Sequence, residues 1–110
     1  MEEEVKSLFK LAYYPIMYAN QRLNGGDFLS VAIPLMDAMK ERTSDEIVLK
    51  KAARIIVLEF NDLLSPKMSV QEIDNLIQLV YKPGTMTRAV AKQISDEFIR
   101  THSSSQSLQK

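Results

Sequence analysis

The stretch IVLKKAARIIVLEFNDLL, residues 47–64, decides how this sequence folds. Apolar residues fill most of it, and most of the polar residues return at intervals that place them on one narrow strip of a helix: Lys50, Lys51, Arg54, Asn61 and Asp62. Its β-branched residues would also suit a strand, but the length of the run and the period of the polar strip favour a helix. A helix that is apolar around most of its surface has to be surrounded by other elements. We therefore predict that residues 47–64 form the central helix of the fold.

Two amphipathic helices are predicted before the central one. In residues 2–23 the apolar positions recur three and four residues apart, which is the spacing of one helical face. The predicted core stripe of this first helix is Val5, Leu8, Phe9, Ala12, Ile16, Ala19 and Leu23. Pro15 is expected to kink or split the helix, and Asn24-Gly25-Gly26 to end it in a left-handed conformation. Asp27 is then the expected N-cap of a second helix.

Capping signals divide the rest of the chain. Thr43 with Glu46, and Ser69 with Glu72, have the spacing of capping boxes, which predicts the start of the central helix and of a fourth helix. The Lys82-Pro83-Gly84 turn is expected to end the fourth helix.

A fifth helix is predicted from Thr85 or Thr87 to about Arg100, with an apolar face that includes Val90 and Phe98. The sequence as a whole therefore predicts an all-α fold. We expect a compact, irregular bundle of about five helices in a single domain, residues 1–100, and a flexible, disordered polar tail at residues 101–110.

Composition excludes several classes of protein. The sequence has 14 Lys and Arg against 14 Asp and Glu, so no net charge steers the chain toward nucleic acid. Cysteine is absent, which removes disulfides and thiolate chemistry. No apolar run approaches the ~20 residues that cross a bilayer, and the acidic start at Glu2–Glu4 is the opposite of a cationic leader. We expect a cytoplasmic protein that does not associate with a membrane.

The residues needed for catalysis do not assemble in the sequence. The only histidine, His102, falls in the predicted tail, where it has no rigid neighbours to orient it. The glycines of the Asn24–Asp27 turn are accompanied by neither the lysine nor the strand of a phosphate-binding loop. We therefore predict no enzymatic activity, no metal or cofactor, and no small-molecule substrate.

A second apolar strip on the first helix suggests a binding surface. Tyr13, Tyr14, Met17 and Tyr18 lie on a face of the helix roughly opposite its predicted core stripe. Either the helix is sandwiched inside the bundle, or this strip contacts another protein, because exposed aromatic and methionine surface is typical of contact sites. The preferred hypothesis is a non-enzymatic interaction module that binds another protein or itself, with a homodimer as the expected form of self-association.

The alternative hypothesis is DNA binding. Residues 69–99 are predicted to form helix, turn and helix, and Gln71-Glu72-Ile73, Met86-Thr87-Arg88-Ala89-Val90 and Glu97-Phe98-Ile99 resemble the helix-turn-helix half of winged-helix regulators. That resemblance implies that the second helix contacts DNA. Small polar residues and an arginine at the start of a helix can reach phosphates and base edges in the major groove, so the candidate DNA-binding residues are Thr85, Thr87, Arg88 and Lys92. The connection is longer than in that family, and no strands follow to form a wing.

Overall fold

The computed structural model describes residues 2–21, 23 and 25–81. In this part of the chain the elements are four α-helices: α1 (Glu2–Asn20), α2 (Gly25–Arg42), α3 (Glu46–Asn61) and α4 (Val70–Tyr81). The all-α prediction is confirmed for these residues, with four helices rather than about five. The predicted fifth helix and the predicted tail lie outside the described residues.

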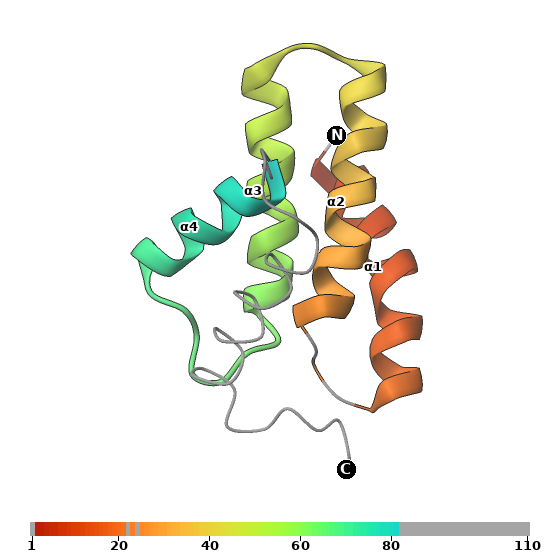
Figure 1. Cartoon of the computed structure of the whole chain (residues 1–110), viewed down its shortest axis with the longest axis vertical. Helices are drawn as coiled ribbons and strands as arrows, with labels where there is room; N and C mark the ends of the chain where they lie inside the picture. The colour runs from red at the N-terminus through yellow and green to blue at the C-terminus, as the bar shows by residue number, and fades with distance from the viewer. Residues whose placement is uncertain (1, 22, 24, 82–110) are drawn as a thin grey trace.

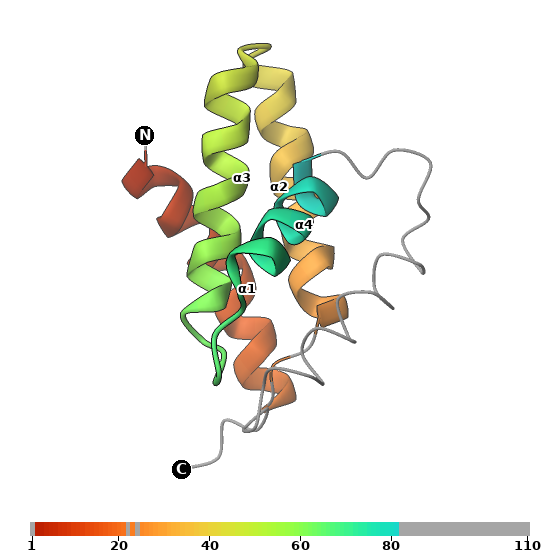
Figure 2. The ribbon, with the colours of Figure 1, turned by 90° about the vertical axis from the view of Figure 1, so that its left-hand side faces the viewer.

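The helices are arranged around the α2–α3 pair. These two helices run antiparallel, joined by a short turn at one end, and α4 crosses them at a steep angle (Figure 1). α1 and α4 each pack against both α2 and α3 but not against one another, so they cover opposite sides of the pair (Figure 2). α3 is central as predicted, and α2 shares that position with it.

Four aromatic rings form the centre of the hydrophobic core. Phe9 and Tyr13 of α1 stack with their centroids 5.2 Å apart, and Phe28 of α2 stacks on Phe60 of α3 at 4.1 Å. The two pairs meet edge to face, with Tyr13 6.0 Å from Phe60 and Phe9 5.7 Å from Phe28. All four side chains are fully buried. Offset and edge-on geometries are the favourable ones for aromatic rings, so this cluster joins three helices at one point.

The connection between α1 and α2 differs from the prediction. α1 ends at Asn20, and Gln21 takes the left-handed conformation with φ 56°. The two glycines that were expected to end α1 instead begin α2, so Asp27 lies inside the first turn of α2 and is not its N-cap. The Asp27 carboxylate accepts a hydrogen bond from the Asn20 side-chain amide, which ties the end of α1 to the start of α2.

Pro15 does not split α1, which continues as one helix from Glu2 to Asn20. Pro34 lies inside α2 in the same way. Both prolines are on the exposed surface. A helix tolerates proline better there, because water can hydrate the carbonyl group that has lost its N–H partner.

The caps of α3 and α4 show one wrong prediction and one confirmed one. The N-cap of α3 is Asp45, whose carboxylate accepts the N–H groups of Ile47 at 2.9 Å and Val48 at 3.4 Å, so the predicted Thr43–Glu46 box is wrong. The Thr43 hydroxyl instead accepts the N–H of Asp45 at 3.1 Å. At α4 the predicted box is confirmed.

In that box the Ser69 N–H donates to the Glu72 carboxylate at 2.9 Å, and the Glu72 N–H donates to the Ser69 hydroxyl at 3.2 Å. These reciprocal bonds satisfy N–H groups that the first turn of a helix leaves free.

Asn61 holds the turn between α3 and α4. It was placed on the polar strip of the central helix. It is nevertheless buried, and its side-chain oxygen accepts the Met68 N–H at 2.8 Å. The loop is thereby fastened to the end of α3.

The other end of α4 is fixed by Tyr81, whose ring lies within cation–π distance of Lys40 and Lys50, at 5.4 and 5.9 Å. Lys40 also donates to the Tyr81 carbonyl oxygen. The end of α4 is thereby tied to both α2 and α3. None of the helices in the described residues is both long enough and apolar enough to cross a bilayer.

The aromatic cluster predicts a large cost for ring removal. We expect Phe28→Ala to lower the free energy of unfolding by about 3–5 kcal/mol, because it removes the partner of Phe60 and leaves a cavity. Phe28→Leu retains most of the apolar volume and should cost clearly less. Urea unfolding followed by circular dichroism measures both, and equal stability of Phe28→Ala and wild type would contradict a central role for the cluster.

The buried amide of Asn61 gives a second stability prediction. Asn61→Leu keeps a similar volume but leaves the Met68 N–H without its acceptor, which should cost about 1–3 kcal/mol. Asn75 is an exposed asparagine on α4, and Asn75→Leu is the matched control. A cost confined to Asn61→Leu, in the same unfolding measurement, is the expected result. Equal effects at the two positions would show that the buried hydrogen bond contributes little.

Candidate functional site

The inner face of α1 is a line of residues spaced four apart. Val5, Phe9, Tyr13 and Met17 are the buried residues of this helix. Residues at this spacing lie above one another along a helix, so all four point into the core. Tyr13 and Met17 are 0% and 2% exposed.

Their burial corrects the predicted binding strip, because Tyr13 and Met17 cannot reach a partner from inside the core. The aromatic contacts of Tyr13 with Phe28 and Phe60 draw this line of residues inward. Leu8, Ala12 and Ala19, which were predicted to face the core, are exposed instead.

The remaining two tyrosines of the strip stay at the surface. Tyr18 is 60% exposed and Tyr14 is half-buried. Their rings meet edge to face with centroids 6.1 Å apart. The structure therefore divides the predicted set into two core residues, Tyr13 and Met17, the partly buried Tyr14, which packs against the core, and the exposed Tyr18.

A continuous apolar surface lies on the other side of α1. We call it the outer face of α1; its exposed residues are Leu8, Leu11, Ala12, Pro15, Tyr18 and Ala19. Leu11 is the most exposed of its large side chains, at 73%. No Asp, Glu, Lys or Arg occurs from Leu11 to Ala19, so no charge on α1 interrupts this part of the surface. A shallow depression lined by Ser7, Lys10, Leu11, Tyr14 and Pro15 adjoins it.

Sequence reasoning missed Leu11 and Pro15 as surface candidates. The signal that could have found them is the same uncharged run, because a helix segment with apolar residues on every side has more apolar surface than its contact with one core can cover.

The two lysines of α1 near this surface each form an ion pair. Lys10 pairs with Glu59 of α3 at 3.7 Å, and Lys6 pairs with Glu3 at 3.9 Å. The side chain of Glu3 is 90% exposed, so the Lys6–Glu3 pair contributes little to stability.

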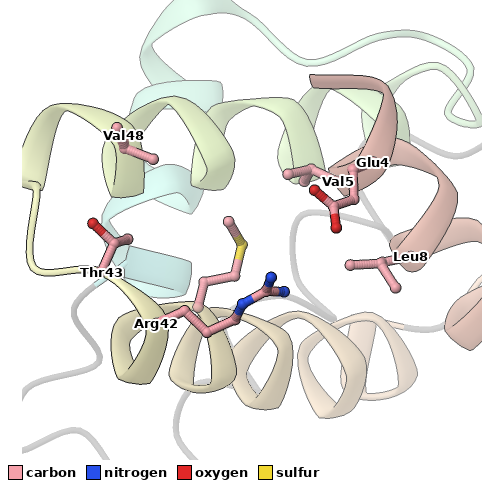
Figure 3. A pocket seen from close by; sticks show the side chains of 7 residues that line it. Glu4, Val5, Leu8, Arg42, Thr43 and Val48 are labelled. Atoms are coloured by element: carbon pink, nitrogen blue, oxygen red, sulfur yellow. The ribbon is translucent and has the colours of Figure 1, made fainter. Parts of the chain in front are cut away.

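A pocket of about 240 Å³ opens at one end of the bundle. Figure 3 shows Glu4, Val5 and Leu8 of α1 on one side and Arg42, Thr43 and Val48 from the α2–α3 end on the other. Its lining is mainly apolar, and its polar residues, Glu4, Arg42 and Thr43, are not buried. The pocket could therefore enclose a small apolar group, but its lining contains no buried polar group that would orient a reacting molecule.

A second groove lies between α1 and α3, and its lining mixes charges of both signs: Glu2, Lys6, Lys51, Arg54, Ile55, Leu58, Glu59 and Asp62. Within the described part of the chain no three His, Asp or Glu side chains gather as a metal site would require.

The residues of the DNA-binding hypothesis are not described. Thr85, Thr87, Arg88 and Lys92 lie outside the described residues, as does His102. The first helix of the predicted pair is α4, whose exposed positions include Gln71, Asp74, Asn75 and Gln78, and whose sequence contains no Lys or Arg. α4 itself thus brings no cation to a phosphate backbone.

The division of the tyrosines predicts opposite effects of the same substitution. Tyr13→Ser should destabilise the fold by about 3 kcal/mol or more, because it removes a buried ring from the aromatic cluster. Tyr18→Ser should change stability by less than about 0.5 kcal/mol, because most of its ring is already in water. Thermal or urea unfolding distinguishes the two, and a large loss for Tyr18→Ser would contradict the assignment of this residue to the surface.

Comparison with known proteins finds no relative from which a function could be transferred. No protein-family model, no curated protein and no solved structure matches this chain.

Proposed function

We propose that this chain is a non-enzymatic helical protein–protein interaction module, and that the outer face of α1, with Tyr14 at its edge, is the binding surface. The observation that carries the proposal is the cluster of exposed apolar residues on α1, most of them in the uncharged segment from Leu11 to Ala19. Single apolar residues on a surface are ordinary, but a contiguous group marks a contact site.

The chemistry of this surface suits a protein partner. Tyrosine is enriched in the centres of protein interfaces because its ring gives a large apolar area and its hydroxyl can still bond water or a polar group. Burying the exposed part of a Leu or Tyr side chain contributes about 1–2 kcal/mol at ~25 cal/mol per Å². A few such side chains together supply enough free energy for a reversible complex.

The surface is also held rigidly. The opposite side of the same helix is locked into the aromatic cluster by Phe9 and Tyr13, so the outer residues are presented on a fixed backbone. A preformed surface loses less conformational entropy on binding than a mobile loop does. This supports α1 as a binding element in preference to the connecting segments.

DNA binding through Thr85, Thr87, Arg88 and Lys92 stays a prediction of the sequence alone, because these residues lie outside the described part of the chain. The helix before them, α4, contains no Lys or Arg that could add a phosphate contact. A titration with duplex DNA at low salt would test it separately, because phosphate contacts are strongest under that condition.

The double substitution Leu11→Ser with Tyr18→Ser tests the proposed surface. Both side chains are exposed, so the fold should be retained while binding weakens by about tenfold or more. The measurements are the molar mass of the purified chain and the proteins it retains from a cell extract. Val70→Ser is the matched control, because Val70 is 76% exposed on α4, which lies on the side of the bundle opposite α1. Unchanged mass and unchanged capture in the double variant would contradict the proposal.

A further inference from the structure

The exposed residues of α1 follow the spacing of a helix–helix seam. Leu8, Leu11, Pro15 and Tyr18 are separated by three, four and three positions. This is the spacing of the a and d positions of a heptad repeat, which carry the contacts when two helices pack side by side. The outer face of α1 is therefore shaped to receive another helix.

The positions beside the seam are neutral. Ala12 and Ala19 lie along one side, and Ser7 and Tyr14 along the other. These are the positions at which charged residues normally select or reject a partner helix. Small alanines also let two helices approach closely.

The neutral residues along both sides of the seam favour a partner helix that is also neutral at these positions. A helix with charged flanks would have to leave those charges unpaired against neutral side chains, which is costly when they lose water. A second copy of this chain presents the same neutral residues, and its formal net charge is zero, so the copies do not repel each other at long range.

We propose that the outer face of α1 pairs with the same face of a second copy of this chain, antiparallel and with twofold symmetry. This inference rests on the proposed function and names the partner. A parallel pair would bring the acidic starts of both helices, Glu2–Glu4, together at one end with both helix dipoles aligned. The antiparallel pair places those starts at opposite ends.

The seam sets the register of the antiparallel pair. The a and d positions alternate across it, so Leu8 faces Tyr18 of the second copy and Leu11 faces Pro15 of the second copy. The twofold axis then passes close to the middle of α1. Each bundle lies behind its own α1, because α2 and α3 pack on the inner side of that helix.

The size of the contact predicts a reversible dimer. One helix face from each copy gives an area near or below the ~1,200 Å² lower limit of stable interfaces. The four helices of the described residues already form a core within each copy, so association is not needed to bury it. We expect a dissociation constant on the order of 10–100 μM.

Sedimentation equilibrium of the full chain measures this association. The average mass should rise with concentration from the 12.5 kDa of one chain toward twice that value. Leu11→Glu should keep the chain monomeric at concentrations where wild type is half dimeric, because it places a carboxylate in the seam. Val70→Glu, with a similarly exposed position on α4, should dimerise like wild type. A monomeric wild type, or equal effects of the two variants, would overturn the dimer.

Disulfide trapping tests the orientation, since the chain has no cysteine of its own. A mixture of Leu8→Cys and Tyr18→Cys chains should form mainly the mixed disulfide under mild oxidation, and each variant alone should stay largely reduced. Two copies of residue 18 would lie about 15 Å apart along the antiparallel pair, beyond the ~7 Å that a disulfide spans. Efficient disulfides within each variant alone would show a parallel pair, and equal amounts of all products would show random collision; either result refutes the proposed arrangement.

Self-association and capture of another protein, measured together, distinguish failure of the dimer from failure of the proposed function. If wild type stays monomeric but retains another protein that the Leu11→Ser, Tyr18→Ser chain does not retain, the surface binds a different partner and only the inference is wrong. If neither self-association nor capture responds to that double substitution, both are wrong.

Discussion

The contact of the Phe9 and Tyr13 rings with Phe28 and Phe60 is the constraint on which the rest of the structure depends. Edge-to-face contacts are directional, so they fix the rotation of α1 about its own axis as well as its distance from α2 and α3. Once that rotation is set, the residues on the other side of the helix have to face outward. The core and the candidate binding surface are therefore two consequences of one packing arrangement.

Features that depend on local sequence could be predicted, and features that depend on packing could not. The Ser69–Glu72 cap forms as expected because both of its hydrogen bonds lie within four residues. The central position of α3 was predictable because a helix with so narrow a polar strip has few alternatives. Asn61 was misplaced because its burial depends on the Met68 N–H, which reaches it only when the following loop folds back.

The rotation of α1 shows why the candidate site was only half predictable. From Leu11 to Ala19 every residue is uncharged, so several rotations of the helix would bury a similar apolar area. Periodicity predicted that Leu8, Ala12 and Ala19 face the core. In the structure the packing of α1 on α2 and α3 buries Tyr13 and Met17 instead. Hydrophobicity indicated that the helix has two apolar sides, but only the partners Phe28 and Phe60 decide which side is inward.

Pro15 adds an independent reason to assign a role to the outer face of α1. A proline in the interior of a helix removes a backbone hydrogen bond and costs on the order of 3 kcal/mol relative to alanine. Pro15 is exposed, so core burial of its ring does not offset that cost in a single chain. The same holds for Leu11 and Tyr18, because polar residues at those positions would leave the aromatic cluster intact. Pro15, Leu11 and Tyr18 therefore contribute little to the fold of one chain, yet all three lie on one seam. Burial of that seam against a second surface would make all three side chains stabilising.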